Sequence, residues 1–465
     1  MILCQNQGLL ASRARVRHTM VALPVQPIRA DSGPNDPSVV TANRVSPVML
    51  GVCLLVLLAF CTATVFVQAA WALQSFQIGI FVLLVVYFAA GIRSGKSPFA
   101  GGLAQWLVYA IPIWGLVQIA THTTASTFET RASVLRWAAL AGVFFLSQAF
   151  GRTRSAQRAF LSAFLCFATA MSLLCLLQLS TSEGRVFWIF PTIYPEVFAT
   201  FQSPNSYAQF VELALPIALW RALREGWRSW WYAPAGGFLY ASVIGSASRT
   251  GTALCTAELL AMVAIGLVRF RDPETGLPTR STTALLAVIP VLAVVFAFCV
   301  GWESVLARFQ QDDPFRVRRE FLIAAVDMAK QRPLTGYGLG TFPKVYQRYA
   351  IKDFPFYANH AHNDWAEFAA EGGVPFLFLV LIPFAAAVPA AIRNPWGLGL
   401  IAIMLHACDD FPFPRPAVSG WLFAILGLLY MTRMLDRKRM RIAGPPSADV
   451  LPPVIGPIGP QAPGR

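Results

Sequence analysis

The sequence predicts an all-α polytopic membrane protein, on three observations. Apolar residues make up 56% of the 465 positions, and charged residues make up only 13%. The mean hydropathy is +0.55. Apolar windows close to the roughly 20 residues that cross a bilayer recur along the whole chain. Because such helices pack in lipid and against one another, we expect one integrated bundle.

The apolar windows, taken in order, predict about twelve transmembrane helices. Two of them are interrupted by polar groups: the sixth contains Gln209, Glu212 and Pro216, and the eleventh contains His406 and Asp409. The predicted spans are 47–68, 73–91, 100–120, 134–150, 159–179, 206–221, 230–247, 250–268, 281–301, 373–392, 396–411 and 417–433.

The segments outside these windows divide into two tails and one large loop. Residues 1–46 are polar, proline-containing and basic, which predicts a disordered cytoplasmic tail. No apolar stretch closely follows the first charges, so a cleaved signal peptide is not expected. The bundle is assigned to 47–433, including a large loop at 302–372, and 434–465 form a basic, then Pro-rich, cytoplasmic tail.

The positive charges act as topology signals rather than as a nucleic-acid surface. The net charge is +14, but Lys and Arg gather in alternate short loops and in the tails. This pattern places both termini in the cytoplasm and the 302–372 loop on the outer face, because long loops escape the positive-inside rule. The eight cysteines show no disulfide or zinc spacing.

The large loop contains two predicted helices joined by a turn. In "RVRREFLIAAVDMAKQ", helical periodicity puts Phe321, Ala324, Ala325 and Met328 on one face. Pro333 ends this helix, and "TGYGLGTF" follows as a Gly-rich turn. Asn363 or Asp364 begins the second helix, with Glu367 in capping-box register after Asp364, and "AEGG" ends it.

Arg249 is the first candidate site residue. It lies in "GSASRTGTAL", between two apolar runs, and must sit at or inside the outer membrane boundary. An arginine at that depth indicates a function unless it snorkels to the interface. The hydroxyl groups of Ser246, Ser248 and Thr250 beside it can donate hydrogen bonds to a bound anion.

Arg316, Arg318 and Arg319 at the start of the first loop helix form the second candidate. Guanidinium groups bind phosphate oxygens bidentately, so the cluster is a pyrophosphate clamp if it faces Arg249. By itself, such a cluster is also typical of a solvated helix face.

The third candidate is "HAHND". His360 and His362 alternate, so an extended backbone would put both on one side, where a histidine can accept a proton and Asn363 or Asp364 can orient its ring. The competing interpretations are a packed histidine and a His-x-His metal site, for which no third strong ligand lies nearby.

Three further features have a simpler interpretation. "GYGLGTF" follows a helix and a proline instead of a strand, so we do not interpret it as a nucleotide loop. In "TFQSPNSYAQF", Asn205 is expected to cap the sixth span. Glu212 and Glu258 lie inside apolar spans, where each either pairs with an arginine such as Arg249 or relays protons in a transporter.

Together, "RREFLIAAVDMAKQRPLTGYGLGTF" and "HAHNDWAEFAAEGGVPF" resemble the bacterial O-antigen ligase and Wzy-type polymerase family, and "TFQSPNSYAQ" and "SASRTG" also resemble family elements. The resemblance covers roughly 200–433. One departure is Leu322, where the family usually has tryptophan.

The resemblance implies a GT-C-type glycosyltransferase of the bacterial inner membrane whose active site faces the periplasm. It implies a saccharide donor on undecaprenyl pyrophosphate, a glycan or lipid-linked acceptor, and no metal or other cofactor. His362 would be the general base, and Arg249 and Arg318 would bind the pyrophosphate. Arg319, Arg316, His360, Asn363, Glu367 and Asn205 are further expected substrate-binding residues.

Alternatives remain at this stage. A proton-coupled transporter would use Glu212 and Glu258, although no internal repeat supports it. A non-catalytic envelope scaffold would leave the histidines and arginines unexplained. Within the enzyme class, the sequence leaves open both ligase and polymerase, acting on lipopolysaccharide, exopolysaccharide or another acceptor.

Overall fold

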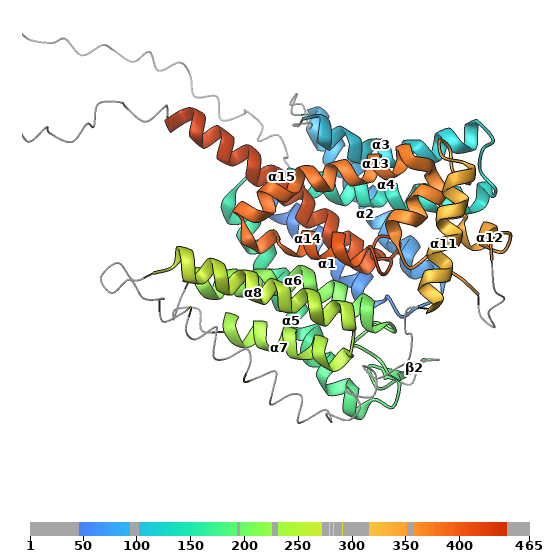
Figure 1. Cartoon of the computed structure of the whole chain (residues 1–465). Coiled ribbons are helices and arrows are strands. Elements are labelled where there is room, and N and C mark those ends of the chain that lie inside the picture. The colour runs from blue at the N-terminus through green and yellow to red at the C-terminus, as the bar shows by residue number, and fades with distance from the viewer. Residues whose placement is uncertain are drawn as a thin grey trace, which may run out of the picture. The chain divides into compact units, whose positions relative to one another are not determined.

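The computed structural model describes residues 46–93, 102–192, 196–225, 231–271, 316–350 and 357–443, together with residues 279, 282 and 291. The predicted N-terminal tail therefore lies almost wholly outside the described residues, as do residues 444–465 of the predicted C-terminal tail and most of the predicted span 281–301. The described chain is nearly all helical (Figure 1). A short antiparallel pair, β1 (Arg185–Val186) and β2 (Phe190–Pro191), is its only sheet.

An all-α membrane fold is confirmed, but the count of twelve spans is not. Seven of the described helices are long and apolar enough to cross a membrane: α2, α3, α4, α5, α8, α13 and α15. Helices α1, α7 and α14 have only 17, 15 and 8 residues, and α6 carries the polar groups noted above. The bounds are α1 Pro47–Ala63, α2 Ala70–Arg93, α3 Leu103–Ala120, α4 Thr127–Phe150, α5 Arg154–Thr181, α6 Pro204–Glu225, α7 Tyr232–Ser246, α8 Arg249–Arg269, α11 Arg316–Gln331, α12 Phe342–Tyr346, α13 Asp364–Arg393, a 3₁₀ turn Pro395–Gly397, α14 Gly399–His406 and α15 Pro416–Ala443.

Helices α4 and α15 form the centre of the bundle. In each of these helices, 83% of the residues of the most apolar 18-residue window are buried inside the protein. Close approach depends on Gly427 of α15, where an added Cβ would lie 1.9 Å from Ser147 Oγ of α4. Trp421 of α15 stacks on Phe164 of α5 with ring centroids 4.2 Å apart, and its indole N–H donates to Thr62 of α1. Helix α15 runs on to Ala443, ten residues past the predicted end of the span at 433.

Helix α6 is buried on every side among α5, α7, α8 and α14, so its polar residues must find partners inside the protein. Asn205, Gln209 and Glu212 fall on one face, because they are spaced by four and three residues. This face points toward α8 and α14, and it forms one wall of the site described below.

The predicted loop helix is confirmed as α11, with Phe321, Ala324, Ala325 and Met328 buried. These residues join Tyr337, Phe342 and Tyr346 in a small core of their own. Helices α11 and α12 lie beside the first part of α13 at one end of the bundle (Figure 1). The predicted break at "AEGG" is also present, because Gly373 has φ 74° and Val374 N–H donates to Pro333 O instead of continuing the helix.

The Gly-rich turn is a structural element that braces α13. Tyr337 and Gly338 donate their backbone N–H groups to Ala370 O and Glu371 O, and the Glu371 carboxylate accepts from Gly340 N–H and Phe342 N–H. Gly338 has φ 106°, and an added Cβ would lie 2.1 Å from Thr124 Oγ1. Glycine is therefore required here both by conformation and by space.

We expect Gly338→Ala to destabilise the protein by about 1–3 kcal/mol, because the substitution combines an unfavourable φ with a steric clash. The measurement is the thermal unfolding midpoint in detergent. Gly91→Ala is the matched control: an added Cβ there would meet no described atom within 4 Å, and alanine favours the helix. Equal midpoints for the two variants would contradict this account of the turn.

Candidate functional site at the start of α13

The site is built around the loop at residues 407–415, which connects α14 to α15 and is called the acid loop here. Its course is set by backbone bonds: His406 O accepts from both Asp409 N–H and Asp410 N–H. Asp364 N–H at the start of α13 donates to Ala407 O, and Phe413 N–H donates to the Asp364 carboxylate. The acid loop and the start of α13 are therefore locked together.

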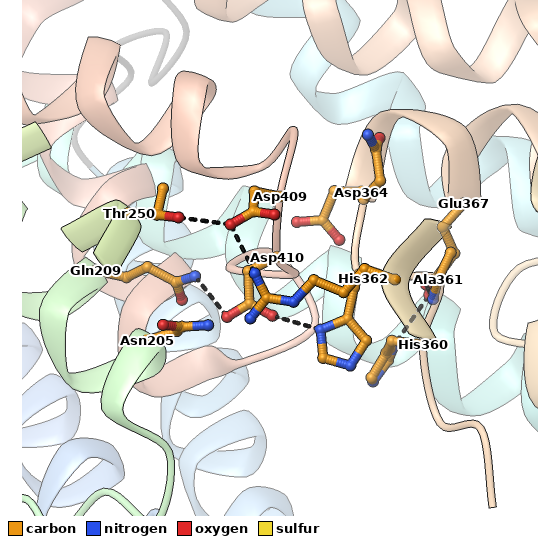
Figure 2. Close-up of polar contacts among 12 residues, drawn as sticks. Asn205, Gln209, Thr250, His360, Ala361, His362, Asp364, Glu367, Asp409 and Asp410 are labelled. Atoms are coloured by element: carbon orange, nitrogen blue, oxygen red, sulfur yellow. Dashed lines mark hydrogen bonds and ion pairs between the residues drawn. The ribbon is translucent and has the colours of Figure 1, made fainter. Parts of the chain in front are cut away.

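Asp410 is the buried carboxylate of the acid loop, with 1% of its surface exposed. His362 Nδ1 lies 3.1 Å from Asp410 Oδ1, and Gln209 Nε2 donates to Oδ2 at 3.2 Å (Figure 2). Burial by itself would raise the pKa of Asp410, but the His362 hydrogen bond and the charges of Arg415, His362 and His406 outweigh it and lower the pKa below its usual value. The ionised carboxylate therefore contributes stability above its unfolded pKa of about 4, and this is lost only at strongly acid pH.

The ionised Asp410 fixes the tautomer of His362. A carboxylate only accepts hydrogen bonds, so His362 Nδ1 carries the proton and donates it, and Nε2 keeps a lone pair. His362 also adopts a left-handed backbone with φ 52°, which turns its ring toward Asp410. The arrangement is that of a positioned general base.

Asp409 binds a cationic side chain and a hydroxyl group from two different helices. Arg318 Nη1 of α11 lies 2.6 Å from Asp409 Oδ2, and the Thr250 hydroxyl of α8 donates to the same oxygen at 2.5 Å (Figure 2). The neighbouring carboxylates, Asp409 and Asp410, thus join α8 and α11 to α6 and His362 across one short loop.

The two histidines differ in their partners. His360 Nδ1 lies 2.8 Å from Glu367 Oε1, and Glu367 Oε2 accepts from Ala361 N–H at 2.6 Å (Figure 2). Phe411 of the acid loop lies between the imidazoles: it stacks on His360 at 4.3 Å and meets His362 edge-on at 4.8 Å. Neither Asn363 nor Asp364 orients a histidine, so that expectation was wrong.

Asn363 and Glu367 have structural bonds in place of the predicted capping box. Asn363 is the N-cap, since its side chain accepts from Ala366 N–H, and it also donates to Cys408 O. Glu367 is then one position too late for the box. Asn205 likewise does not precede its helix, because α6 begins at Pro204; its side chain accepts a hydrogen bond from Ser248.

The predicted arginines divide into an inner and an outer pair. Arg249 is half-buried and opens α8, one residue before Thr250, so its backbone lies beside the acid loop. Arg318 is half-buried and bonded to Asp409, whereas Arg316 and Arg319 are exposed on α11. The structure therefore brings Arg318 and His362 onto adjacent acid-loop residues, with the Arg249 backbone next to them.

Sequence reasoning missed Asp409 and Asp410 as site residues. Both follow the apolar run of α14, and the sequence analysis noted Asp409 only as a weakness of the eleventh span. The signal that could have identified them is a pair of adjacent acidic residues at the edge of a membrane segment. Such residues need partners as much as an arginine there does.

Glu212 also has a partner that the sequence did not suggest. Its Oε1 lies 2.7 Å from His406 Nδ1, and both side chains are fully buried. The expected arginine is absent from this pair, and His406 is the residue whose carbonyl positions the acid loop. The pair is therefore a support of the site.

The fold and the site together define a class of protein. It is a multi-pass helical membrane protein with a histidine–carboxylate pair and arginines at one end of its bundle. Residues 234–381 match the family model described as O-antigen ligase. Because that stretch contains Arg249, Arg318 and His362, the resemblance drawn from their motifs is confirmed. None of the curated proteins matches the chain. The match gives the transporter alternative no support.

We expect His406→Ala to lower the stability of the protein by about 3–5 kcal/mol, because it leaves Glu212 buried without its partner. The measurement is thermal unfolding in detergent. Adding Glu212→Gln to His406→Ala should recover much of the loss, since the unpaired charge is then removed. An unchanged midpoint in the single variant would show that the pair does not support the fold.

Proposed function

We propose that this protein is a glycosyltransferase that moves a saccharide from undecaprenyl pyrophosphate to an acceptor hydroxyl at the periplasmic face of the bacterial inner membrane. The observation that carries the proposal is the His362–Asp410 pair within a site that also gathers Arg318 and the start of α8. The O-antigen ligase match supports the same reaction class. The acceptor is part of a lipopolysaccharide or another surface polysaccharide.

His362 acts as the general base. Its Nε2 accepts the proton of the acceptor hydroxyl as that oxygen attacks the anomeric carbon of the donor sugar. Asp410 stabilises the imidazolium that forms, because it is buried beside Nδ1 and remains ionised. A base positioned in this way contributes about 10²- to 10⁴-fold to the rate.

Arg249 and Arg318 stabilise the leaving group. The bond between the anomeric carbon and the pyrophosphate oxygen breaks, and its electron pair remains on the phosphate. Asp409 binds Nη1 of Arg318 and so holds its guanidinium at the site. A fixed positive charge there stabilises phosphate oxygens, and the effect is strong in a water-poor site. No metal is needed to offset the charge that develops.

The depth of the site suits a lipid-linked donor. Arg249 opens a candidate membrane span, and α13, which directly follows residues 357–363 (called the histidine loop here), opens another. A polyprenyl chain in the bilayer would hold its pyrophosphate at this boundary. With this lipid-linked donor, the proposed reaction needs no soluble nucleotide sugar.

We expect His362→Ala to abolish saccharide transfer while the protein still inserts and purifies normally. The assay mixes purified protein with a synthetic undecaprenyl-pyrophosphate oligosaccharide and an acceptor, with and without EDTA, and measures released polyprenyl pyrophosphate and product size. His122→Ala, an exposed histidine in the α3–α4 connection, is the control and should be fully active. Undiminished transfer in His362→Ala, or loss of transfer in EDTA, would refute this mechanism.

We expect Asp410→Asn to reduce kcat by about 10²-fold or more. The reason is that an amide does not fix the proton on His362 Nδ1 and does not stabilise the imidazolium that forms. Asp327→Asn, on the exposed side of α11, should leave kcat unchanged. A wild-type kcat in Asp410→Asn would show that Asp410 does not act through His362.

A further inference from the structure

A cavity of about 420 Å³ lies beside the proposed catalytic pair, and the mechanism above does not use it. It is formed by α4, the histidine loop, α13 and the acid loop. His360 and Phe411 line it, but His362 does not. Since Phe411 also meets His362 edge-on, the cavity is separated from the general base by a single aromatic ring.

The walls of the cavity carry charges of both signs. Arg136 and Arg415 face Glu129, Glu367 and Glu371 around the same space. Each carboxylate already has a partner: Lys344 for Glu129, His360 for Glu367, and the Gly340 and Phe342 N–H groups for Glu371. The cavity therefore has no large excess of positive charge with which to select a phosphate.

Arg136 is the residue best placed to bind a ligand. Among the described residues it donates only to Pro414 O at 3.2 Å and Ser133 Oγ at 3.0 Å, both uncharged acceptors. Two of its five N–H donors are thus used. Its remaining donors, beside carboxylate acceptors, suit a compound that carries many hydroxyl groups.

The floor of the cavity is aromatic. Trp137, Phe368 and Phe413 line it and pack edge-on or tilted against one another. Apolar rings below and polar groups at the rim are the combination that small-molecule sites use for binding and orientation. The volume is at the lower end of the range for such sites and would hold about one or two sugar rings.

From these observations we propose that the cavity is a subsite for an uncharged sugar unit of the acceptor glycan, adjacent to the unit that reacts at His362. Phe411 forms the wall between this subsite and the base, and His360, held by Glu367, lines the subsite. Arg136 is a substrate-positioning residue and takes no part in proton transfer. The inference rests on the proposed function, because it assumes a glycan acceptor.

The test compares Arg136→Gln with Arg131→Gln, an exposed arginine on the same helix α4. We expect Arg136→Gln to raise KM for a neutral acceptor oligosaccharide about tenfold, with kcat and KM for the donor unchanged. Arg136→Lys, which keeps the charge but loses the fork, should fall between wild type and Arg136→Gln. Arg131→Gln should behave as wild type.

A second variant guards against misfolding, because Arg136 also anchors the acid loop at Pro414. Asn359 is an exposed residue at the rim of the cavity, and Asn359→Trp should block it without disturbing the core. In the inactive His362→Ala background, calorimetric titration with the same oligosaccharide should show at least tenfold weaker binding when Asn359→Trp is added.

The outcomes separate the two proposals. Wild-type transfer with an unchanged acceptor KM in both Arg136→Gln and Asn359→Trp would overturn the subsite and leave the proposed function standing. An effect of Arg136→Gln confined to acceptors with acidic sugars would overturn the assignment to an uncharged unit. No wild-type transfer to any acceptor would overturn the proposed function itself.

Discussion

Two adjacent carboxylates at the edge of the membrane bundle are the constraint that organises the site. Asp410 is almost fully buried and Asp409 partly so, and neither can remain there without partners. Their partners come from α6, α8, α11 and the histidine loop, which are far apart in sequence. The electrostatic cost of the acid loop is thus offset only when these four elements meet, so correct folding and assembly of the site are one event.

The same reasoning explains why many polar residues around the site support the acid loop and the start of α13. Glu371, Gln118 and the glycines of the turn fasten the start of α13, and Gln118 donates to both Thr335 O and Glu371 O. His406 and Glu212 fasten the other side of the acid loop from within the bundle. A functional site held to within about 0.5 Å needs rigid supports of this kind. The Gly-rich motif is therefore a brace between helices.

The sequence predicted local features well and long-range partners poorly. The buried face of α11, the break at Gly373 and the helices that coincide with the predicted spans follow from periodicity and glycine chemistry, which neighbouring residues determine. The partner of His362 could not be read in this way, because Asp410 lies 48 residues further along the chain. Neighbours in sequence, Asn363 and Asp364, were the natural choice, but helix capping and the acid-loop backbone already engage them. The structure nevertheless brings Arg318 and His362 onto adjacent residues of the acid loop, with Thr250, the neighbour of Arg249, bonded to the same loop.

The two histidine–carboxylate pairs illustrate how one short motif can serve two tasks. His362 and His360 are two residues apart and contact the same Phe411 ring, yet their carboxylates come from different elements. Asp410 belongs to the acid loop, which also holds Arg318, so His362 is coupled to the charged part of the site. Glu367 belongs to α13 and lines the cavity, so His360 is coupled to the polar part, which carries charges of both signs. The proposed transferase binds an anionic donor and a hydroxyl-rich acceptor at once, and an aromatic ring between the histidines would give each substrate an environment suited to its own charge.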